Sequence, residues 1–485
     1  MHPIFSIKVT LLSTEVGFVT FLITVKCRLY CNASLFINSE RFIHLKIIHT
    51  SDWHLGQHFM GKSRQPEHQA FLDWLLELAV EHMVDAIIVA GDIFDTGSPP
   101  SYARELYNQF IVSLQATGVH LVILGGNHDS VAMLSESKSL LSYLNTHVIP
   151  GAMANPEEQV LLLKGANKEP IGLICAIPFL RARDIVMSLE GQSGAEKQHN
   201  LQMAISGHYQ AVFAHAKEKQ ITLGGSIPII ATGHLTTVGA KTSESVRDIY
   251  IGTLDAFPSS AFPPAAYIAL GHIHRHQKVG GSEHIRYCGS PIPLSFDELS
   301  NDKQVLIVEF KGAELKSVSE HKIPRFQAMH LIKGDLNEIE AEVKRLAPLY
   351  KTNQPAWLDI EVTTQDFLQD LQQRIQTLIE GFPLEVLLLR RARTNRQVGL
   401  VQENKETLHE LTVKDVFERR LALEDWQGEE EEAKLKRLHQ AFDEVVDALQ
   451  QARVSERLQS EIKNDSLSEN QNVDIEAEMQ VDQSK

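Results

Sequence analysis

The sequence is poor in cysteine, with only four in 485 residues. That number provides no disulfide framework for a chain of this length. Cys175 and Cys288 lie in or beside strand-like stretches, where we expect them to pack as small apolar residues. Cys27 and Cys31 lack the second pair of ligands that a structural zinc site needs. Cysteine usage therefore favours a reducing compartment, and we expect a cytoplasmic protein.

The sequence also lacks an apolar run long enough to predict a membrane-spanning helix. Residues 5–27 come nearest, but Lys8 and Glu15 interrupt a stretch that would need about 20 mostly apolar residues. The chain start has neither the basic segment nor the cleavage site of a signal peptide. We expect no membrane association. Residues 1–44 are interpreted as an extension of doubtful structure, as an upstream start codon in the gene model would produce.

Basic residues are not in excess, because the formal net charge is −16. An acidic balance argues at first sight against a nucleic-acid partner. Residues 421–485, however, hold 17 acidic and 7 basic residues, against 45 acidic and 39 basic in the remainder. Bound divalent cations would offset part of that smaller excess. Net charge therefore does not exclude nucleic acid.

Composition and periodicity divide the chain into five expected segments. The length predicts about three domains, and 43% apolar and 22% charged residues are ordinary for a globular protein. After the extension, residues 45–323 alternate between strand-like and helix-like stretches, and residues 324–395 repeat that alternation on a smaller scale. Residues 396–460 are charged and helical in pattern, and residues 461–485 form a disordered acidic tail by composition.

Apolar periodicity predicts the elements of these segments. The larger domain has expected strands at 46–49, 85–90, 120–124, 227–232 and 267–270, and helices at 67–83 and 101–117. The smaller domain has expected strands at 327–333, 357–362 and 384–389, and helices at 336–346 and 367–379. Two further helices are expected at 413–423 and 433–458. This alternation predicts the α/β class.

Five short motifs rich in histidine and carboxylates follow the C-terminal ends of the expected strands. They are Asp52-Trp53-His54, Gly91-Asp92-Ile93-Phe94-Asp95, Gly125-Gly126-Asn127-His128-Asp129, Gly233-His234 and Gly271-His272-Ile273-His274. The carboxyl ends of strands are where open α/β sheets place ligand sites. Glycine at these turns allows close approach of the backbone to a metal or phosphate.

The motifs supply seven candidate metal ligands, which suit two divalent ions that share one carboxylate. We assign the first ion to Asp52, His54, Asp92 and His274, and the second to Asp92, Asn127, His234 and His272. Asp92 is the bridging candidate, because a carboxylate has two oxygens that can serve two ions. Mixed nitrogen and oxygen ligands suit Mn²⁺, Fe²⁺ or Zn²⁺. Such a site activates water and stabilises the attacking and leaving oxygens of a phosphoester.

His128 is the histidine that this assignment leaves unused. We expect it to stabilise developing charge or to protonate the leaving oxygen. Asp95 could orient the His128 ring, as carboxylates often do for catalytic histidines. Asp129 is interpreted as a turn-stabilising residue. Most of the 22 histidines, such as His82 and His208, are expected to be surface or packing residues.

These ordered motifs resemble those of the calcineurin-like metallophosphoesterase superfamily, and within it the SbcD family of bacterial nuclease subunits. The narrower resemblance is carried by residues 48–56 (IHTSDWHLG), 91–100 (GDIFDTGSPP), 231–239 (ATGHLTTVG), 247–254 (RDIYIGTL) and 287–291 (YCGSP). It runs from about residue 46 to residue 423, and it leaves out the extension and the acidic tail.

The resemblance implies a fold, an activity and a metal. Residues 45–323 would form a metallophosphoesterase β-sandwich flanked by helices, followed by a small α/β capping domain at 324–395 and C-terminal helices. The activity would be manganese-dependent cleavage of DNA in replication, recombination and repair. It would include 3′-to-5′ exonuclease action on duplexes and endonuclease action on single strands and hairpins.

The resemblance also implies a partner. SbcC, an SMC-like coiled-coil ATPase, would bind two copies of this chain in a heterotetramer associated with the nucleoid. The family docks on that coiled coil through the helical region 396–460, where Val413, Val416, Phe417 and Leu421 would form the apolar face. We expect no nucleotide site in this chain, so ATP would act through the partner.

Five basic residues in loops near the motifs are candidates for contacts with DNA phosphates. They are Arg64, Arg181, Arg183, Lys241 and Arg247.

Two other functions remain open from the sequence. A phosphatase or cyclic-nucleotide phosphodiesterase of the same superfamily would use the same ligands, but would need neither a capping domain nor C-terminal helices. A scaffolding subunit with a decayed site would have lost ligands, whereas all of them are present here.

Overall fold

The computed structural model describes residues 7–12, 20–25, 43–186, 193–243, 245–246, 256–363, 368–392 and 437–438. The chain divides into two compact units, residues 1–394 and 395–485. Arg247, the acidic tail and the expected helix at 413–423 lie outside the described residues. The expected helix at 433–458 is described only at 437–438, which are helical.

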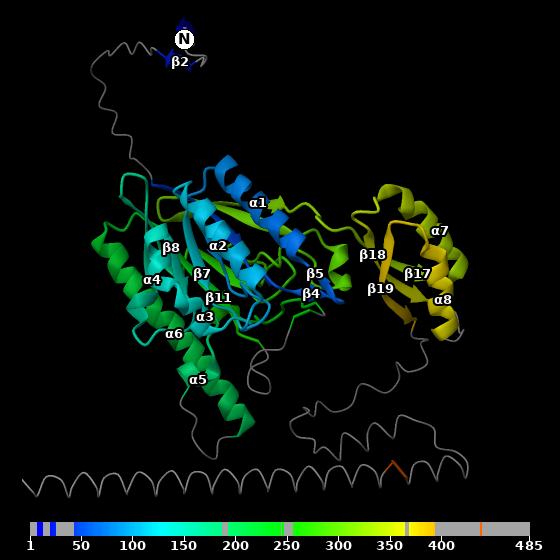
Figure 1. The fold of residues 1–485 in the computed structure, drawn as a ribbon. Coiled ribbons are helices and arrows are strands. Elements are labelled where there is room, and N and C mark those ends of the chain that lie inside the picture. The colour runs from blue at the N-terminus through cyan, green and yellow to red at the C-terminus, as the bar shows by residue number, and fades with distance from the viewer. Residues whose placement is uncertain are drawn as a thin grey trace, which may run out of the picture. The chain divides into compact units, whose positions relative to one another are not determined.

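Two six-stranded sheets form the centre of the first unit (Figure 1). The first sheet has the order β16-β15-β3-β6-β7-β8. Its strands are β3 (His44–Thr50), β6 (Ala86–Val89), β7 (His120–Leu124), β8 (Thr146–Ile149), β15 (Gln304–Lys311) and β16 (Glu314–Lys322). The second has the order β13-β14-β12-β11-β10-β9. Its strands are β9 (Val160–Lys164), β10 (Pro170–Cys175), β11 (Ile229–His234), β12 (Tyr267–Gly271), β13 (Gln277–Lys278) and β14 (Ile285–Tyr287).

Successive side chains of a strand point to opposite sides of its sheet, so each sheet has an inner and an outer face. The two sheets pack against each other through their inner faces. On β3, Leu45 and Ile47 join the apolar cluster shared with the second sheet, whereas Ile48 joins the cluster under the helices. His49 is buried between the sheets, with its ring nitrogens 2.9 Å from the Tyr267 hydroxyl and 3.2 Å from the Leu270 carbonyl oxygen. The expected β-sandwich is thus confirmed.

Helices cover both outer faces of the sandwich (Figure 1). α1 (Gln65–Glu81) and α2 (Ser101–Gln115) pack on the first sheet, and α6 (Gly194–Thr222) packs on the second. The shorter helices are α3 (Val131–Glu136), α4 (Lys138–Leu141) and α5 (Ala182–Ile185). The expected helices at 67–83 and 101–117 are confirmed as α1 and α2.

The longest of the described helices, α6, was not expected from the sequence. It buries Leu201, Ile205, Tyr209, Val212 and Ala216, which repeat at spacings of four and three. Its N-terminus has a capping box, in which Ser193 and Glu196 bond each other's backbone amides. Both signals are present in the sequence, but polar residues around most of the helix obscure them.

The parallel strands bring the five motifs to one edge of the sandwich. β3, β6 and β7 are mutually parallel, as are β11 and β12. Each of these five strands ends at a motif. Since parallel strands end at the same edge of a sheet, loops far apart in sequence meet there.

A small module follows the sandwich. Its parallel sheet has the order β17-β18-β19 and is covered by two helices. The elements are β17 (Met329–Gly334), α7 (Leu336–Leu346), β18 (Ala356–Val362), α8 (Leu368–Ile379) and β19 (Leu384–Arg391). They match the three strands and two helices expected here. The module meets the sandwich at an apolar cluster, which we call the junction, of Phe59, Phe296, Met329 and Trp357.

Two small hairpins complete the description. β1 (Ile7–Leu12) pairs antiparallel with β2 (Thr20–Val25), so part of the extension is regular. β4 (His58–Phe59) pairs with β5 (Lys62–Ser63). None of the described helices combines the length and apolar character needed to cross a bilayer.

Arg64 is a buried structural residue, so its expected contact with a DNA phosphate is wrong. The side chain is fully buried. Its guanidinium forms a two-point ion pair with Glu67, with Nη2 2.8 Å from Oε2, and Nη1 donates to the Pro293 carbonyl at 2.8 Å. It also lies over the rings of Phe59 and Trp357 at the junction. A group that is desolvated and fully bonded in this way cannot reach a phosphate.

Replacing Glu67 with Gln should destabilise the protein strongly. The variant leaves the Arg64 charge buried opposite a neutral amide, and breaking a buried pair costs about 3–5 kcal/mol. Chemical denaturation should show this loss as a lower free energy for the unfolding transition of the sandwich. The control is Lys316→Gln, which removes an exposed pair with Glu309 and should change stability by less than about 1 kcal/mol. Equal effects of the two substitutions would contradict a structural role for the buried pair.

Candidate metal centre

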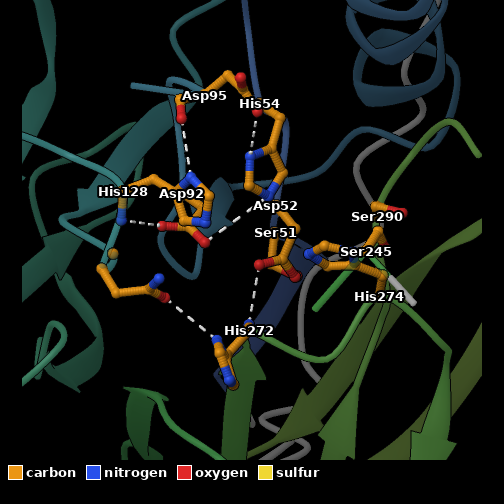
Figure 2. Close-up of polar contacts among 12 residues, drawn as sticks. Ser51, Asp52, His54, Asp92, Asp95, His128, Ser245, His272, His274 and Ser290 are labelled. Atoms are coloured by element: carbon orange, nitrogen blue, oxygen red, sulfur yellow. Dashed lines mark hydrogen bonds and ion pairs between the residues drawn. The ribbon is translucent and has the colours of Figure 1, made fainter. Parts of the chain in front are cut away.

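The structure brings all seven expected ligands together at the sandwich edge. Figure 2 shows Asp52, His54, Asp92, His272 and His274 among them. Three groups of side chains each have their ligating atoms within 4.8 Å of one another. One of them joins His128 to His54 and Asp92, and the other two fall within the two expected ligand sets. Of these two, the first group is Asp52, His54 and His274, and the second is Asp92, His234 and His272. Asn127 completes the second group, with Oδ1 2.9 Å from His234 Nε2 and 3.1 Å from His272 Nδ1.

The backbone is strained at four of these seven residues. Asp52, His54, Asp92 and His272 have positive φ values of 54°, 47°, 50° and 91°. Residues other than glycine rarely adopt this backbone conformation, which costs of order 1–3 kcal/mol per residue. The loops therefore turn sharply after their strands and direct the side chains inward. Half of the eight non-glycine residues with positive φ in the described part of the chain are candidate ligands, which supports a functional role for the cluster.

Two motif glycines are required because ligand atoms lie where a larger residue would place its side chain. A Cβ atom at Gly91 would lie 2.1 Å from Nδ1 of His234, and one at Gly126 would lie 2.1 Å from Oδ1 of Asp92. Any other residue at either position would displace a candidate ligand. The glycines of the motifs are therefore part of the site.

Asp92 lies between the two groups, as expected of a bridging ligand. Its Oδ2 is 3.2 Å from Nε2 of His234 and 3.7 Å from Nε2 of His54. Its Oδ1 accepts a hydrogen bond from the His128 amide at 2.9 Å. Burial alone would raise the pKa of Asp92, but the imidazoles of His234 and His54 hold it well below its usual range. The carboxylate is thus ionised and available to a cation.

The histidines are oriented for ligation. Nδ1 of His234 donates to the Ala90 carbonyl oxygen at 2.9 Å, which leaves Nε2 facing Asp92 and Asn127. Burial lowers the pKa of His234, but Asp92 outweighs burial and raises it to about 9. Burial, followed by the neighbouring His234, holds the pKa of His272 well below its usual range.

The donor atoms fit divalent cations. Nε2 of His54 and Nε2 of His272 are buried and have no hydrogen-bond partner among the described residues. Buried polar atoms without partners are costly, and imidazole nitrogens beside ionised carboxylates are good ligands for Mn²⁺, Fe²⁺ or Zn²⁺. The residues present therefore suit the ions that the sequence predicts.

Asp95 contacts His128, but not through the atoms we expected. Nδ1 of His128 donates to the main-chain carbonyl oxygen of Asp95 at 2.8 Å. The Asp95 carboxylate instead faces the ligand His54, with Oδ1 3.3 Å from Nδ1 (Figure 2). The His128 ring lies against the His54 ring, with 4.7 Å between centroids. Asp95 thus orients two rings, one by its backbone and one by its side chain.

Asp129 ties two of the motif loops together. Its carboxylate accepts hydrogen bonds from the amides of Ile93 and Phe94 at 3.1 and 3.0 Å, and from that of Gly126 at 2.8 Å. Burial, with a smaller contribution from Asp92, raises the pKa of Asp129 to about 6. These bonds agree with the expected turn-stabilising role.

Sequence reasoning missed the residues that surround His274. Ser245, Ser290, Glu298 and Lys303 lie beside this ligand and belong to no motif that we singled out for chemistry. The motif at residues 287–291 contains Ser290, which was noted only as part of the resemblance. Glu298 and Lys303 have no local pattern that would reveal them, since their role depends on contacts across 24 and 29 residues.

The other basic candidates for phosphate contacts differ in position. Arg181 is half-buried beside the site, and its Nη2 donates to the Asp129 carbonyl oxygen at 2.8 Å. Arg183 is exposed and lies 3.6 Å from the Asp184 carboxylate. Lys241 is exposed, and its backbone amide donates to Gln277. Among these three, only Arg181 contacts a motif loop.

Residues 56–63 (GQHFMGKS) match the spacing of a nucleotide-binding phosphate loop, a match that our expectation of no nucleotide site overlooked. A phosphate loop leads from a strand into a helix and cradles phosphates with its backbone amides. Here the β4–β5 hairpin closes across the segment, and Lys62 pairs with the Glu385 carboxylate of the small module. The conformation is therefore not that of a phosphate loop.

Comparison with known proteins finds similarity over most of the chain. The family model for calcineurin-like phosphoesterases matches residues 45–276, and one described as a type 5 capsule protein repressor C-terminal domain matches residues 325–425. The SbcD subunit of nuclease SbcCD from Escherichia coli (strain K12) is 54% identical over 407 residues, which cover 84% of this chain and 98% of the relative. Its counterpart in Rhodobacter capsulatus is 31% identical, with coverage of 70% and 86%. That of Bacillus subtilis is 30% identical, with coverage of 67% and 80%.

Metal binding should release protons near neutral pH. In the metal-free protein His234 is protonated below about pH 9, whereas a ligating imidazole must be neutral. Apparent affinity for Mn²⁺ should therefore rise about tenfold per pH unit up to pH 9 for one displaced proton, and then level off. Calorimetry at pH 7.5 in buffers of different ionisation enthalpy would count the protons. A count of zero would contradict the raised pKa of His234.

Proposed function

Because this chain belongs to the SbcD family of calcineurin-like nuclease subunits, it is a metal-dependent phosphodiester hydrolase, and we propose that it cleaves DNA with two bound divalent ions. The observation that carries the proposal is the pair of ligand groups around one shared carboxylate, Asp92. Two ions at such a site activate water and stabilise the attacking and leaving oxygens of a phosphodiester.

We propose Mn²⁺ as the resident ion at both positions. The first would be held by Asp52, His54, Asp92 and His274, and the second by Asp92, Asn127, His234 and His272. Nitrogen and oxygen donors without thiolates favour Mn²⁺ or its neighbours over softer metals. The manganese preference itself comes from the resemblance to the family.

His128 is proposed to act on the leaving oxygen or on the charge that develops there. Its Nδ1 donates to the Asp95 carbonyl, and a carbonyl only accepts, so Nδ1 carries a hydrogen. The proton that His128 can transfer is therefore the one on Nε2, in the imidazolium form. The backbone amide of the same residue is bonded to Asp92, which fixes the ring beside the first ligand group.

The proposed substrates are DNA ends, hairpins and single strands, with 3′-to-5′ exonuclease action on duplexes and endonuclease action on the other two. Arg181 is proposed to contact a substrate phosphate, because it is bonded to the loop of Asn127 and His128 and is partly open to solvent. Arg183, Lys241 and Arg247 remain proposed as weaker phosphate contacts.

The proposed partner is an SbcC-like ATPase. The relatives described above are named as subunits of an SbcCD nuclease, which supports a two-protein assembly. Val413, Val416, Phe417 and Leu421 are proposed to form the docking helix, and ATP would act through the partner.

A second copy of this chain is proposed as a further partner. α4 and the following 3-10 helix η1 (Ser142–Leu144) expose Leu140 and Tyr143 by 66% and 85%. The two residues are three positions apart, where helical side chains are neighbours, and contiguous exposed apolar patches mark protein contacts.

Replacing His128 with Ala should greatly reduce cleavage without loss of metal. We expect cleavage of end-labelled duplex and hairpin DNA in Mn²⁺ to fall by about 10²–10⁴-fold, the usual effect of losing a proton donor. Metal content and DNA binding should be unchanged, and the wild type should be assayed with and without the partner ATPase. The control His199→Ala removes an exposed histidine of α6.

Loss of metal from His128→Ala would contradict the assigned role. Cleavage of a nitrophenyl phosphodiester by the wild type, with no cleavage of DNA in the presence of metal and partner, would favour a small-substrate phosphodiesterase. Bound metal with no turnover on any ester would favour a scaffold.

Self-association should depend on the exposed apolar residues of α4 and η1. The double variant Leu140→Asp, Tyr143→Asp should be monomeric in light scattering after size-exclusion chromatography at a concentration where the wild type is a dimer. Ile221→Asp, which changes an exposed residue at the end of α6, is the control. A monomeric wild type, or an unaffected double variant, would refute this surface.

A further inference from the structure

The candidate ligand His274 is bonded at Nδ1 by a half-buried serine and a buried glutamate. Its Nδ1 lies 2.5 Å from the Ser245 hydroxyl and 3.5 Å from Oε1 of Glu298. The Ser245 hydroxyl donates to the same carboxylate oxygen. A hydroxyl that donates its hydrogen to a carboxylate can still accept a hydrogen bond from an imidazole. These two hydrogen bonds therefore place the His274 hydrogen on Nδ1 and leave Nε2 for the ion. Figure 2 shows Ser245 against the His274 ring.

Glu298 is itself held rigidly. Only 2% of the residue is exposed. Its Oε2 accepts from Nζ of Lys303 at 2.6 Å and from the Leu294 amide at 3.0 Å. Burial alone would raise the pKa of Glu298, but Lys303 holds it well below its usual range, so the group is ionised. A carboxylate fixed by several bonds in this way can hold its neighbouring ring in one orientation.

Lys303 bonds to more than its ion-pair partner. Its Nζ also donates to the main-chain carbonyl oxygen of His274 at 3.0 Å and to the Ser290 hydroxyl at 2.7 Å. The backbone of His274 is thus held by the lysine, while its ring is held by the glutamate through Ser245. Both attachments belong to one buried ion pair.

The 3-10 helix that carries Glu298 faces the small module on its other side. This helix, η4 (Phe296–Ser300), begins with Phe296, which packs at the junction with Phe59, Met329 and Trp357. The Phe296 and Phe59 rings are 5.1 Å apart. The carbonyl oxygen of Leu299 accepts from Arg325, at the start of the small module, at 3.1 Å. Two residues of η4 therefore bond or pack at the module, and Glu298 between them supports a metal ligand.

We propose that Glu298 is a positioning residue for the metal ligand His274, and that η4 makes ion binding at the first position depend on the junction with the small module. The inference rests on the proposed two-ion site. It predicts that changes to η4 weaken the ion held by Asp52, His54 and His274. The ion held by Asn127, His234 and His272 should keep its affinity.

The first test is Glu298→Gln in the full-length chain, with Mn²⁺ binding as the readout. Calorimetry should show two ions in the wild type, with one of them bound about 10–100-fold more weakly in the variant, the usual effect of losing such a support. Anomalous scattering from crystals at limiting Mn²⁺ should show which position loses occupancy. Glu283→Gln, which removes a carboxylate paired with Lys278 and Arg286 away from the ligands, is the control.

A second variant separates positioning from simple charge balance. Glu298→Gln leaves Lys303 without its partner, and this alone could disturb the fold. The double variant Glu298→Gln, Lys303→Met removes both charges and should fold, yet should still show weak binding at the first position. Wild-type affinity in the double variant would overturn the proposal, because Glu298 would then serve only to neutralise Lys303.

The junction is tested by Phe296→Ala. We expect a several-fold loss of Mn²⁺ affinity at the first position only, although the residue touches no ligand. Phe310→Leu, a core change at the end of β15 that pairs with Leu45, is the control and should leave both affinities unchanged. Equal weakening of both positions by Phe296→Ala would refute selective coupling through η4. A wild type that binds one ion would refute the two-ion site itself and would be recognised before any variant is compared.

Discussion

The site depends on a single constraint, which is that negative and positive charges must be held together away from water. Asp92 is almost fully buried, yet it is ionised and lies within 4 Å of imidazoles from two other motifs. Without cations this arrangement is balanced by protons, as the raised pKa of His234 shows. Divalent ions would replace those protons with a larger and fixed charge. Metal affinity and proton affinity are therefore opposed at the same atoms.

This constraint accounts for features of the loops that would otherwise be unfavourable. Four of the seven candidate ligands adopt left-handed backbone conformations, and two glycines leave room for ligand atoms where a Cβ would collide. The surrounding structure overdetermines these turns. Asp129, for example, fixes two loops through three amide hydrogen bonds. The strain is tolerated because the sandwich behind it is tightly packed.

The support of the site extends well beyond its motifs. Two of the ligand histidines use different kinds of partner for the second ring nitrogen, namely a main-chain carbonyl for His234, and a serine and glutamate for His274. The second arrangement reaches the small module through η4. A module that contributes none of the seven candidate ligands would thereby influence how well one ion is held, which is the physical content of the proposed coupling.

The sequence by itself determined the α/β class, the five strands that lead to the motifs, the helices α1 and α2, the strands and helices of the small module, and all seven candidate ligands. These were predictable because hydrophobic periodicity and strand-terminal motifs are local properties of the chain. Tertiary structure alone decided that Arg64 is buried and that the Asp95 carboxylate faces His54 rather than His128. It also decided that residues 56–63 form a hairpin instead of a phosphate loop, and that Glu298 supports His274. Each of these outcomes depends on contacts between side chains brought together by packing, and charge, spacing and motif do not encode where such partners will lie.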